Sequence, residues 1–418
     1  MLDPADRDAL LDRFLRYVRI DTQSDPQSLT APSTAKQFDL IRLLAAECEE
    51  LGLEAITVSE RGPAHASLPG TASDAPRIVW CSHVDTSPEN PGANVQPQLV
   101  ENYDGGDIAL AGDASQTIRA SEHPDLADVV GHTLITSDGT TLLGADDKAG
   151  LAVIMTAASI LKRDAQPHGP ITLLFTVDEE IGRGTDHLDL ASLGATAGYT
   201  LDGDSAGKLN VETFSADGAT VIVHGVNIHP SIGNGRLVNA VKLLAQFIAD
   251  LPDDLLGPES SDGRDGFVHP HTIRGGVERA ECDFILRSFE TDDLAVQADR
   301  LRTLAAELEQ REPRCRVEVI VKEQYRNMRD GLAAEPRAAA LAERAIRATG
   351  REPRLEPIRG GTDGSLMTAL GLPTPNLSTG QHTPHSLQEW ASLDEMAHAV
   401  EVLLELASLW ADEAGPNA

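Results

Sequence analysis

The sequence contains few cysteines, few basic residues and no long apolar run, and each of these shortages excludes a class of protein. Only four of its 418 residues are cysteines, and they are scattered: Cys48, Cys81, Cys282 and Cys315. This spacing favours free core thiols in a reducing compartment over a disulfide framework or a thiolate metal site. No apolar stretch reaches the roughly 18 residues of a transmembrane helix. The first residues also lack a basic segment followed by an apolar one, so we expect no signal peptide and a cytoplasmic protein.

Acidic residues are the charged groups in excess. The chain has 66 Asp and Glu against 34 Lys and Arg, which gives a formal net charge of −32. A charge of this sign repels nucleic acid and anionic membranes, and it tolerates metal cations. We therefore expect neither nucleic acid nor a membrane as a partner.

The hydrophobic pattern predicts an α/β domain in the first part of the chain. Helical spacing of apolar residues covers 7–18 and 38–51, and short strand-like runs occur at 78–81, 171–177 and 199–201. Strands that alternate with helices are typical of a mixed, largely parallel sheet. A chain of 418 residues also exceeds what one hydrophobic core usually serves, so we expect a second domain.

The middle of the chain has a different pattern, which predicts an inserted domain. Its expected elements are a strand at 219–223, a helix at 237–248, a strand at 277–286, a helix at 293–311 and a strand at 317–322. This β-α-β-α-β order is typical of a small α+β module with an antiparallel sheet. We therefore expect a catalytic domain in two parts, 1–213 and 328–418, with a smaller domain, 214–327, inserted between them.

Ionisable side chains follow each of the three predicted core strands, and one more begins an apolar helix. They are His83 and Asp85, then Asp178, Glu179 and Glu180, then Asp202 and Asp204, and finally Asp146. Taken singly, each has a structural explanation, such as a helix cap, a core histidine or a solvated acidic pair. Together they should converge at the carboxyl edge of the sheet, where like charges need a compensating cation. Imidazole with carboxylate and no thiolate indicates zinc, manganese or cobalt in a two-metal site, and hence a cytosolic metallohydrolase.

Seven motifs carry a resemblance to a known family. They are SHVDTSP (82–88), YDGGDIAL (103–110), GADDKAG (144–150), DEEIG (178–182), NIHP (227–230), PESSDGRDGF (258–267) and IRGGTDG (358–364). The chain resembles the peptidase T family, which are tripeptide aminopeptidases among the dizinc M20 peptidases. The resemblance runs nearly end to end, from residues 19–24 to Glu389. The metal motifs alone would indicate only an M20-like protein, and YDGGDIAL and RGGTDG narrow it further.

The resemblance implies two zinc ions per subunit, with cobalt or manganese as substitutes. Asp146 would bridge both ions, and the peptide bond after it would be cis, which leaves Asp147 as a conformational partner. His83 and Asp202 would complete the site of one zinc ion. Glu180 and a histidine near the C-terminus would complete the other.

Two histidines are candidates for that last ligand, His382 and His385. In the family an acidic residue lies four positions after the ligand. Glu389 lies four positions after His385, whereas Ser386 lies four positions after His382. We therefore choose His385.

The resemblance also implies the catalytic and substrate-binding residues. Glu179 would be the general base, and Asp85 would orient the imidazole of His83. His229 would act from the inserted domain, which closes over the substrate as a lid and carries the dimer contact in relatives, so a homodimer is expected there. Arg287 and Arg359 are candidates for binding the C-terminal carboxylate of a peptide. For each arginine the alternative is a structural salt bridge.

The function implied by the resemblance is zinc-dependent release of the N-terminal residue from tripeptides, by attack of a metal-activated water. The alternative is another M20-type amidohydrolase, such as a dipeptidase or an N-acyl amino acid deacylase. The altered loop at 231–234 and the missing tyrosines before His385 keep that alternative open. A catalytically silent binding protein of the same fold is disfavoured, because no expected ligand and no base is missing.

Overall fold

The computed structural model describes residues 2–72 and 74–413, and the chain forms two compact units. Unit 1 comprises Met1–Val211, Met328–Glu356 and Thr362–Ala418, and unit 2 comprises Glu212–Asn327 and Pro357–Gly361. Residue 1 and residues 414–418, the outer ends of the expected catalytic domain, lie outside the described residues. Residues 212–213 and Pro357–Gly361 belong to unit 2, although the expected boundaries assigned them to the catalytic domain.

Unit 1 contains, within the described residues, a mixed eight-stranded sheet. Its strands, in spatial order, are β1 (Glu54–Val58), β2 (Ala64–Leu68), β8 (Ile171–Thr176), β3 (Ile78–His83), β9 (Ala197–Gly203), β16 (Asn376–Ser378), β10 (Lys208–Asn210) and β15 (Arg354–Leu355). The central strands β8, β3, β9 and β16 are parallel to their neighbours within that group, and the pairs β1–β2, β2–β8 and β10–β16 are antiparallel. The predicted fold class, a largely parallel sheet with a second antiparallel domain, is confirmed.

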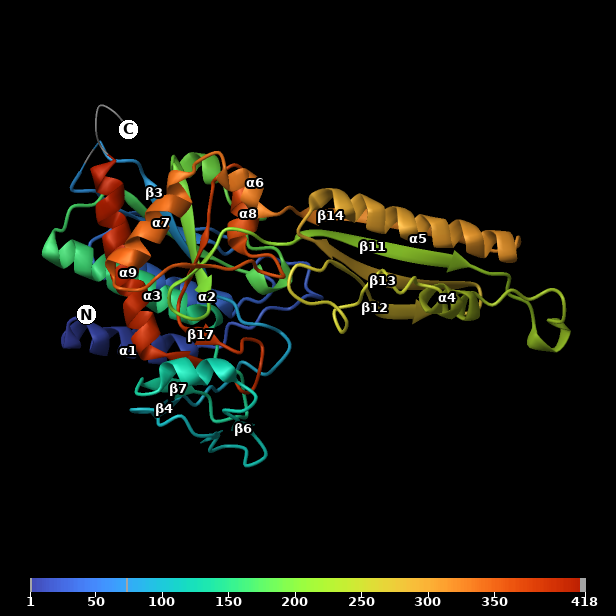
Figure 1. Cartoon of the computed structure of the whole chain (residues 1–418), viewed down its shortest axis with the longest axis horizontal. Coiled ribbons are helices and arrows are strands. Elements are labelled where there is room, and N and C mark those ends of the chain that lie inside the picture. Colours follow the sequence, from blue (N-terminus) through green and yellow to red (C-terminus); the bar gives the residue numbers. More distant parts are fainter. Residues whose placement is uncertain (1, 73, 414–418) are drawn as a thin grey trace. The chain divides into compact units, whose positions relative to one another are not determined.

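Helices cover this sheet and bury its hydrophobic strands. They are α1 (Pro4–Val18), α2 (Gln37–Glu50), α3 (Ala145–Asp164), α6 (Met328–Leu332), α7 (Arg337–Ala348), α8 (Asp363–Ala369) and α9 (Leu393–Asp412). The central helix α3 packs directly on β3 and β9 and also contacts α1 and α9. Figure 1 shows α3 beside α9. Gly150 permits this close packing, because a Cβ atom there would overlap the carbonyl oxygen of Leu201 in β9. The N-terminus of α3 is thereby held against the sheet.

A second, smaller sheet of unit 1 joins the segment before α3 to the segment before α9. Its strands, in order, are β17 (Gln381–His382), β18 (Trp390–Ser392), β7 (Leu134–Thr136) and β4 (Gln98–Val100). The short pair β5 (Ile108–Ala109) and β6 (Thr117–Ile118) and the 3-10 helix η1 (Pro124–Val129) lie between β4 and β7 along the chain. The loop between β17 and β18 contains His385 and so depends on this sheet for its position.

Unit 2 is an antiparallel sheet with two helices. Its strands, in order, are β12 (Phe267–Gly275), β13 (Arg279–Ser288), β11 (Ser215–His224) and β14 (Arg316–Tyr325), and α4 (Ala240–Ala249) and α5 (Thr291–Arg311) pack against them. The hydrophobic pattern of the sequence does not predict β12. This strand contains Pro270, lies at the sheet edge and is largely half-buried or exposed, so it lacks the alternating burial that marks a strand in sequence.

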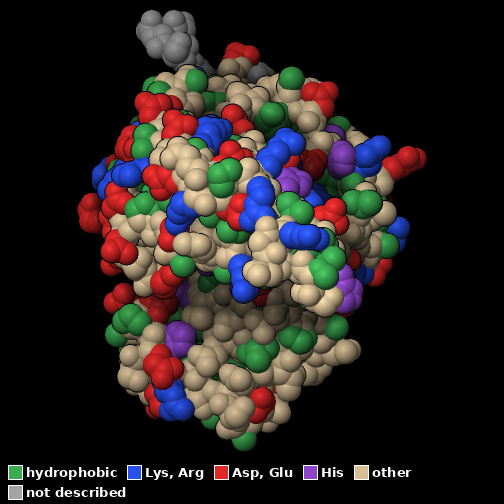
Figure 2. Space-filling view, turned by 90° about the vertical axis from the view of Figure 1, so that its right-hand side faces the viewer, with side chains coloured by type: hydrophobic (Ala, Val, Ile, Leu, Met, Phe, Trp, Pro, Cys, Tyr) green, Lys and Arg blue, Asp and Glu red, His purple; other side chains and the backbone are tan. Residues whose placement is uncertain are grey.

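The surface of the described residues carries charges of both signs. Figure 2 shows acidic and basic side chains interspersed over the face that it draws, with hydrophobic side chains scattered among them. None of the helices described in the structure combines the length and the apolar character that a membrane span requires.

Candidate metal centre

The carboxyl ends of three parallel strands and the N-terminus of α3 deliver the ionisable side chains of unit 1. His83 is the last residue of β3, and Asp202 lies near the end of β9. Glu179 and Glu180 lie in the 3-10 helix η2 (Glu179–Ile181), directly after β8. Asp146 lies at the start of α3, where its backbone is not helical, and its peptide bond to Asp147 is cis, as the resemblance implied.

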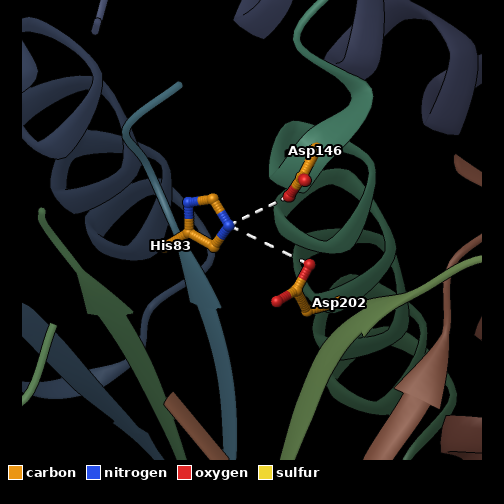
Figure 3. A group of neighbouring side chains, drawn as sticks. All are labelled: His83, Asp146 and Asp202. Atoms are coloured by element: carbon orange, nitrogen blue, oxygen red, sulfur yellow. Dashed lines mark hydrogen bonds and ion pairs between the residues drawn. The ribbon is translucent and has the colours of Figure 1, made fainter. Parts of the chain in front are cut away.

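The first group of candidate ligands consists of His83, Asp146 and Asp202. The Nε2 atom of His83 lies 3.1 Å from Asp146 Oδ1 and 3.9 Å from Asp202 Oδ1, as the dashed lines in Figure 3 indicate. In Figure 3 both carboxylates point toward the imidazole from different elements, Asp146 from the start of α3 and Asp202 from β9. One cation would therefore find a nitrogen and two carboxylates around it.

The second group consists of Asp146, Glu180 and His385. The Nε2 atom of His385 lies 2.7 Å from Glu180 Oε2 and 3.5 Å from Asp146 Oδ2. Asp146 thus offers Oδ1 to the first group and Oδ2 to the second. This arrangement is that of a carboxylate able to bridge two cations.

His382, the other candidate for the last ligand, lies in neither group. Its Nδ1 atom is 2.6 Å from Asp125 Oδ2, and its Nε2 atom is 2.7 Å from Glu395 Oε2. Its ring also stacks on Trp390 with a centroid distance of 3.7 Å. Because both ring nitrogens are engaged, His382 has no nitrogen left for a metal ion.

Asp85 connects the first group to the turn that carries the two glutamates. Its carboxylate accepts hydrogen bonds from the backbone N–H groups of Glu179 (3.0 Å) and Glu180 (3.2 Å). The Nδ1 atom of His83 lies 3.4 Å from Asp85 Oδ1 and 3.0 Å from the Asp85 backbone oxygen. A proton on Nδ1 therefore leaves Nε2 of His83 free to bind a metal ion.

Two further acidic residues, Glu389 and Asp178, hold the backbone around the centre through hydrogen bonds, a role that their sequence motifs did not predict. Glu389 accepts hydrogen bonds from the backbone N–H groups of Leu143 (2.8 Å), Gly144 (2.7 Å) and Asp146 (3.0 Å). In the sequence, the spacing of Glu389 identifies only His385 as a candidate ligand. The sequence signal for Glu389 is its position four residues after a histidine ligand.

Asp178 holds the turn after β8 in the same way. It accepts hydrogen bonds from the Ser33 N–H (2.6 Å), the Ser33 hydroxyl (2.5 Å) and the Gln37 amide (2.6 Å). Its own backbone has a positive φ of 61°. Asp178 thereby ties the loop before α2 to the residues that precede Glu179.

Burial and mutual repulsion dominate the electrostatics of these carboxylates. Burial raises the pKa of Glu179, Asp202 and Asp147 well above the usual range, and neighbouring carboxylates add to the effect. Burial also raises the pKa of Glu180 to about 7. For Asp146 burial acts in the same direction, but hydrogen bonds with His385 and His83 hold its pKa below the usual range.

The donor set and its unpaired atom fit two divalent cations. The side-chain donors are nitrogen and oxygen, which suit zinc, manganese or cobalt. Among the described residues, Glu180 Oε1, which belongs to the second group, is buried without a hydrogen-bond partner. Buried negative charge without a partner is costly, and bound cations would remove that cost.

The three residues expected to bind the substrate lie in unit 2 and belong to neither group. His229 caps the 3-10 helix η4 (Pro230–Ile232), and its Nδ1 atom lies 2.7 Å from the Ser231 hydroxyl. The guanidinium of Arg287 stacks on Tyr325 and donates to the Gln324 side chain at 3.2 Å.

Arg359 stacks on Phe214 and donates to the Gly263 carbonyl at 2.7 Å and to the Ser261 hydroxyl at 2.7 Å. Among the described residues no ion pair with a carboxylate is found for Arg287 or Arg359. The salt bridge considered as the alternative role of each is therefore not seen in this part of the chain.

Comparisons with known proteins agree on one family. Residues 135–409 match Peptidase family M20/M25/M40. A peptidase T from Geobacillus thermodenitrificans is 42% identical over 403 residues, which cover 96% of this chain and 98% of the relative. A peptidase T from Escherichia fergusonii is 43% identical over 408 residues, 97% of this chain and 100% of the relative.

Comparison with solved structures also finds members of the M20 family. The aminopeptidase PepT from Bacillus cereus has a TM-score of 0.74 and 25% identity, covering 97% of this chain and 99% of its own. The Bacillus subtilis YXEP protein, described as a dinuclear metal-binding peptidase from the M20 family, has a TM-score of 0.67 and 15% identity, covering 98% of this chain and 99% of its own, and supports the fold. The chain therefore belongs to the peptidase T family within Peptidase family M20/M25/M40.

Proposed function

We propose that the chain is a zinc-dependent aminopeptidase that releases the N-terminal residue from tripeptides. The observation that carries the proposal is the pair of ligand groups that share Asp146, in a chain 42% identical to a peptidase T. A structural relative from Staphylococcus aureus, with a TM-score of 0.74, is itself described as a tripeptidase. The substrate class follows from this membership and is tested below.

In this proposal, five side chains hold two zinc ions. His83 and Asp202 would hold one ion, Glu180 and His385 would hold the other, and Asp146 would be shared by both. When bound, the two ions polarise the scissile carbonyl and lower the pKa of a water molecule. The protein's part is to fix these five donors in buried positions, so that they need not reorganise during the reaction.

Glu179 is proposed as the general base. Its carboxylate lies 4.0 Å from His83 Nε2, its backbone N–H is fixed by Asp85, and it belongs to neither ligand group. It is thus close to the ligands without being one of them. Glu179 would accept a proton from the attacking water and then deliver it to the departing amine.

The two ends of a peptide substrate carry opposite charges, and the chain offers partners for both. The ammonium group would meet an acidic site, in which Asp147 and Asp363 are buried carboxylates besides the ligands and the base. The C-terminal carboxylate would bind Arg287 and Arg359, whose guanidinium groups stack on aromatic rings. His229 would hydrogen-bond to the oxygen of the scissile carbonyl.

We propose that unit 2 is the lid and dimerisation domain. Its own hydrophobic core supports its role as a separate module. We further propose a homodimer through this unit and a cytoplasmic location, the latter because the four cysteines are free and buried.

A substrate panel tests this function. The purified protein, loaded with zinc, should cleave the first peptide bond of a free-amine tripeptide and lose this activity on chelation. N-acetylation of the tripeptide should lower kcat/KM by about 10- to 100-fold, because a charged hydrogen-bond donor is lost. Amidation of its C-terminus should also lower kcat/KM, and Arg287→Ala or Arg359→Ala should reduce that second penalty.

Each alternative predicts a different result in the same panel. Equal or faster cleavage of the N-acetylated substrate would identify a deacylase, and a preference for dipeptides would identify a dipeptidase. Metal binding without any turnover would indicate a binding protein.

A further inference from the structure

The side chain of Gln381 is buried against one of the two ligand groups. Gln381 is 4% exposed, and its Nε2 atom donates a hydrogen bond to Asp202 Oδ1 at 3.0 Å. Among the described residues it is the one side chain that donates a hydrogen bond to this carboxylate. The backbone of Asp202 is held separately, because its N–H donates to Asn376 Oδ1 at 3.2 Å and its carbonyl accepts from Asn376 Nδ2 at 3.1 Å.

The orientation of the Gln381 amide is determined by its two neighbours. With a cation bound, Asp202 would be ionised and could only accept a hydrogen bond, so an amide turned the other way would place its carbonyl oxygen against an acceptor. With Nε2 facing Asp202, the Oε1 atom accepts from the Thr379 hydroxyl at 3.1 Å. That hydroxyl also lies 2.9 Å from the carbonyl oxygen of Gly203, next to Asp202 in β9. Thr379 therefore anchors the amide to the strand that carries Asp202.

We propose that Gln381 is a positioning residue for one of the two metal ions, through the carboxylate of Asp202. The inference rests on the proposed two-metal centre. Asp202 belongs to the group with His83 and Asp146, and it is absent from the group with Glu180 and His385. The amide of Gln381 fixes the plane of the Asp202 carboxylate. Because Asp202 belongs only to the group with His83, the effect of Gln381 is confined to the cation bound there.

The expected loss of zinc affinity is estimated from other metal sites, in which residues that hydrogen-bond to a metal ligand have been replaced. Removing a residue that orients a ligand typically costs about 10- to 100-fold in metal affinity. Gln381→Met keeps the length of the side chain and removes the donor. We therefore expect one zinc dissociation constant to rise about 10- to 100-fold, while the other changes by less than about threefold.

The experiment is a zinc titration of the metal-free protein in competition with a chromophoric chelator, which yields two dissociation constants. Thr379→Val should raise the same dissociation constant by a smaller factor, because it removes the hydroxyl that holds the Gln381 amide but leaves the amide in place. Thr379→Ser keeps the hydroxyl and should have the native dissociation constant. Gln388→Met is the matched control, because Gln388 lies in the loop that follows β17 and hydrogen-bonds to His123 and Gln116 but not to Asp202. It should leave both constants unchanged.

The outcomes separate this inference from the proposed function. If the native protein binds fewer than two zinc ions, the two-metal function fails. If the native protein binds two and Gln381→Met binds both with native affinity, or weakens both equally, only the role of Gln381 is overturned. Thermal melting of each metal-free variant shows whether it is folded. If Gln381→Met does not fold, Thr379→Val and Thr379→Ser decide the question by the same titration.

Discussion

At the scale of the residue, adjacent carboxylates in this site have different surroundings. Glu180 lies 2.7 Å from His385 Nε2 and belongs to a ligand group, whereas Glu179 belongs to neither group and lies 4.0 Å from His83 Nε2. The turn of η2 directs the Glu180 side chain toward His385 and the Glu179 side chain toward His83. Two consecutive glutamates can thus take the different proposed roles of ligand and base.

Glu179→Gln should separate catalysis from metal binding. The amide cannot accept a proton, so turnover should fall by about two to four orders of magnitude. Both zinc ions should remain, because Glu179 is not a proposed ligand, and this can be measured by elemental analysis beside steady-state kinetics. Glu180→Gln is the matched variant and should weaken zinc binding. Loss of metal from Glu179→Gln would exclude it as a pure base.

At the scale of the element, the loop between β17 and β18 sends two nearby histidines to different partners. Thr383 and His385 have positive φ values of 52° and 60°, so the chain reverses sharply after His382. His382 then pairs with Asp125 of η1 and Glu395 of α9, while His385 faces Glu180. Sequence spacing alone could not reveal this reversal.

His382→Gln should lower stability in a pH-dependent manner. Burial alone would lower the pKa of His382, but Asp125 and Glu395 raise it to about 9. This value lies above the unfolded value of about 6.5, so the stabilisation is fully present below about pH 6.5 and is lost as the pH rises through about 9. The variant should lose about 3 kcal/mol at pH 6, because it leaves the buried Glu395 and the half-buried Asp125 without their charged partner, and little at pH 10.

Denaturant unfolding of both proteins at pH 6, 8 and 10 measures this difference. A difference that grows toward pH 10 would contradict the assignment of His382 as the charged partner of the two carboxylates. His385→Ala is the control for metal binding, because it should lose one zinc ion while His382→Gln keeps both.

A second prediction at this scale concerns the N-terminus of α3. Glu389 holds three backbone N–H groups at residues 143, 144 and 146, and Asp146 is shared by both ligand groups. Glu389→Gln would direct an amide donor at an N–H donor and displace Asp146. Both zinc dissociation constants should therefore rise, by about 10-fold or more, in the competition titration. A rise in only one of them would show that Glu389 does not act through the bridging residue.

At the scale of the whole molecule, each unit has its own hydrophobic core, and both proposed ligand groups lie in unit 1. Zinc should therefore stabilise unit 1 by mass action, by about 2.7 kcal/mol per site at a free concentration of 100 times Kd. Calorimetry with and without a chelator should show a higher Tm for the metal-bound protein. A melting curve that zinc leaves unchanged, or an active protein free of metal on elemental analysis, would contradict the two-metal function.

Much of this protein could be predicted from its sequence, because the relevant signals are local. Fully buried strands such as 78–83 and 171–176 are nearly continuous apolar runs, and the helix that begins near Asp146 is apolar on most faces. Parallel strands place their carboxyl ends together, so the meeting of His83, Glu180 and Asp202 followed from their position after strands. The edge strand β12 escaped prediction because its side chains are only partly buried.

The sequence by itself determined the fold class, the family and the kinds of donor at the metal centre, because apolar runs and short motifs act over a few neighbouring residues. The tertiary structure alone decided which side chains far from those donors in the sequence support them. Gln381 contacts Asp202 across 179 positions of the chain, and Glu389 contacts Asp146 across 243 positions. Gln381 in the sequence carries no sign of its partner, and Glu389 is marked only by its spacing from His385. The partners themselves are set by the packing of strands and helices that lie far apart along the chain.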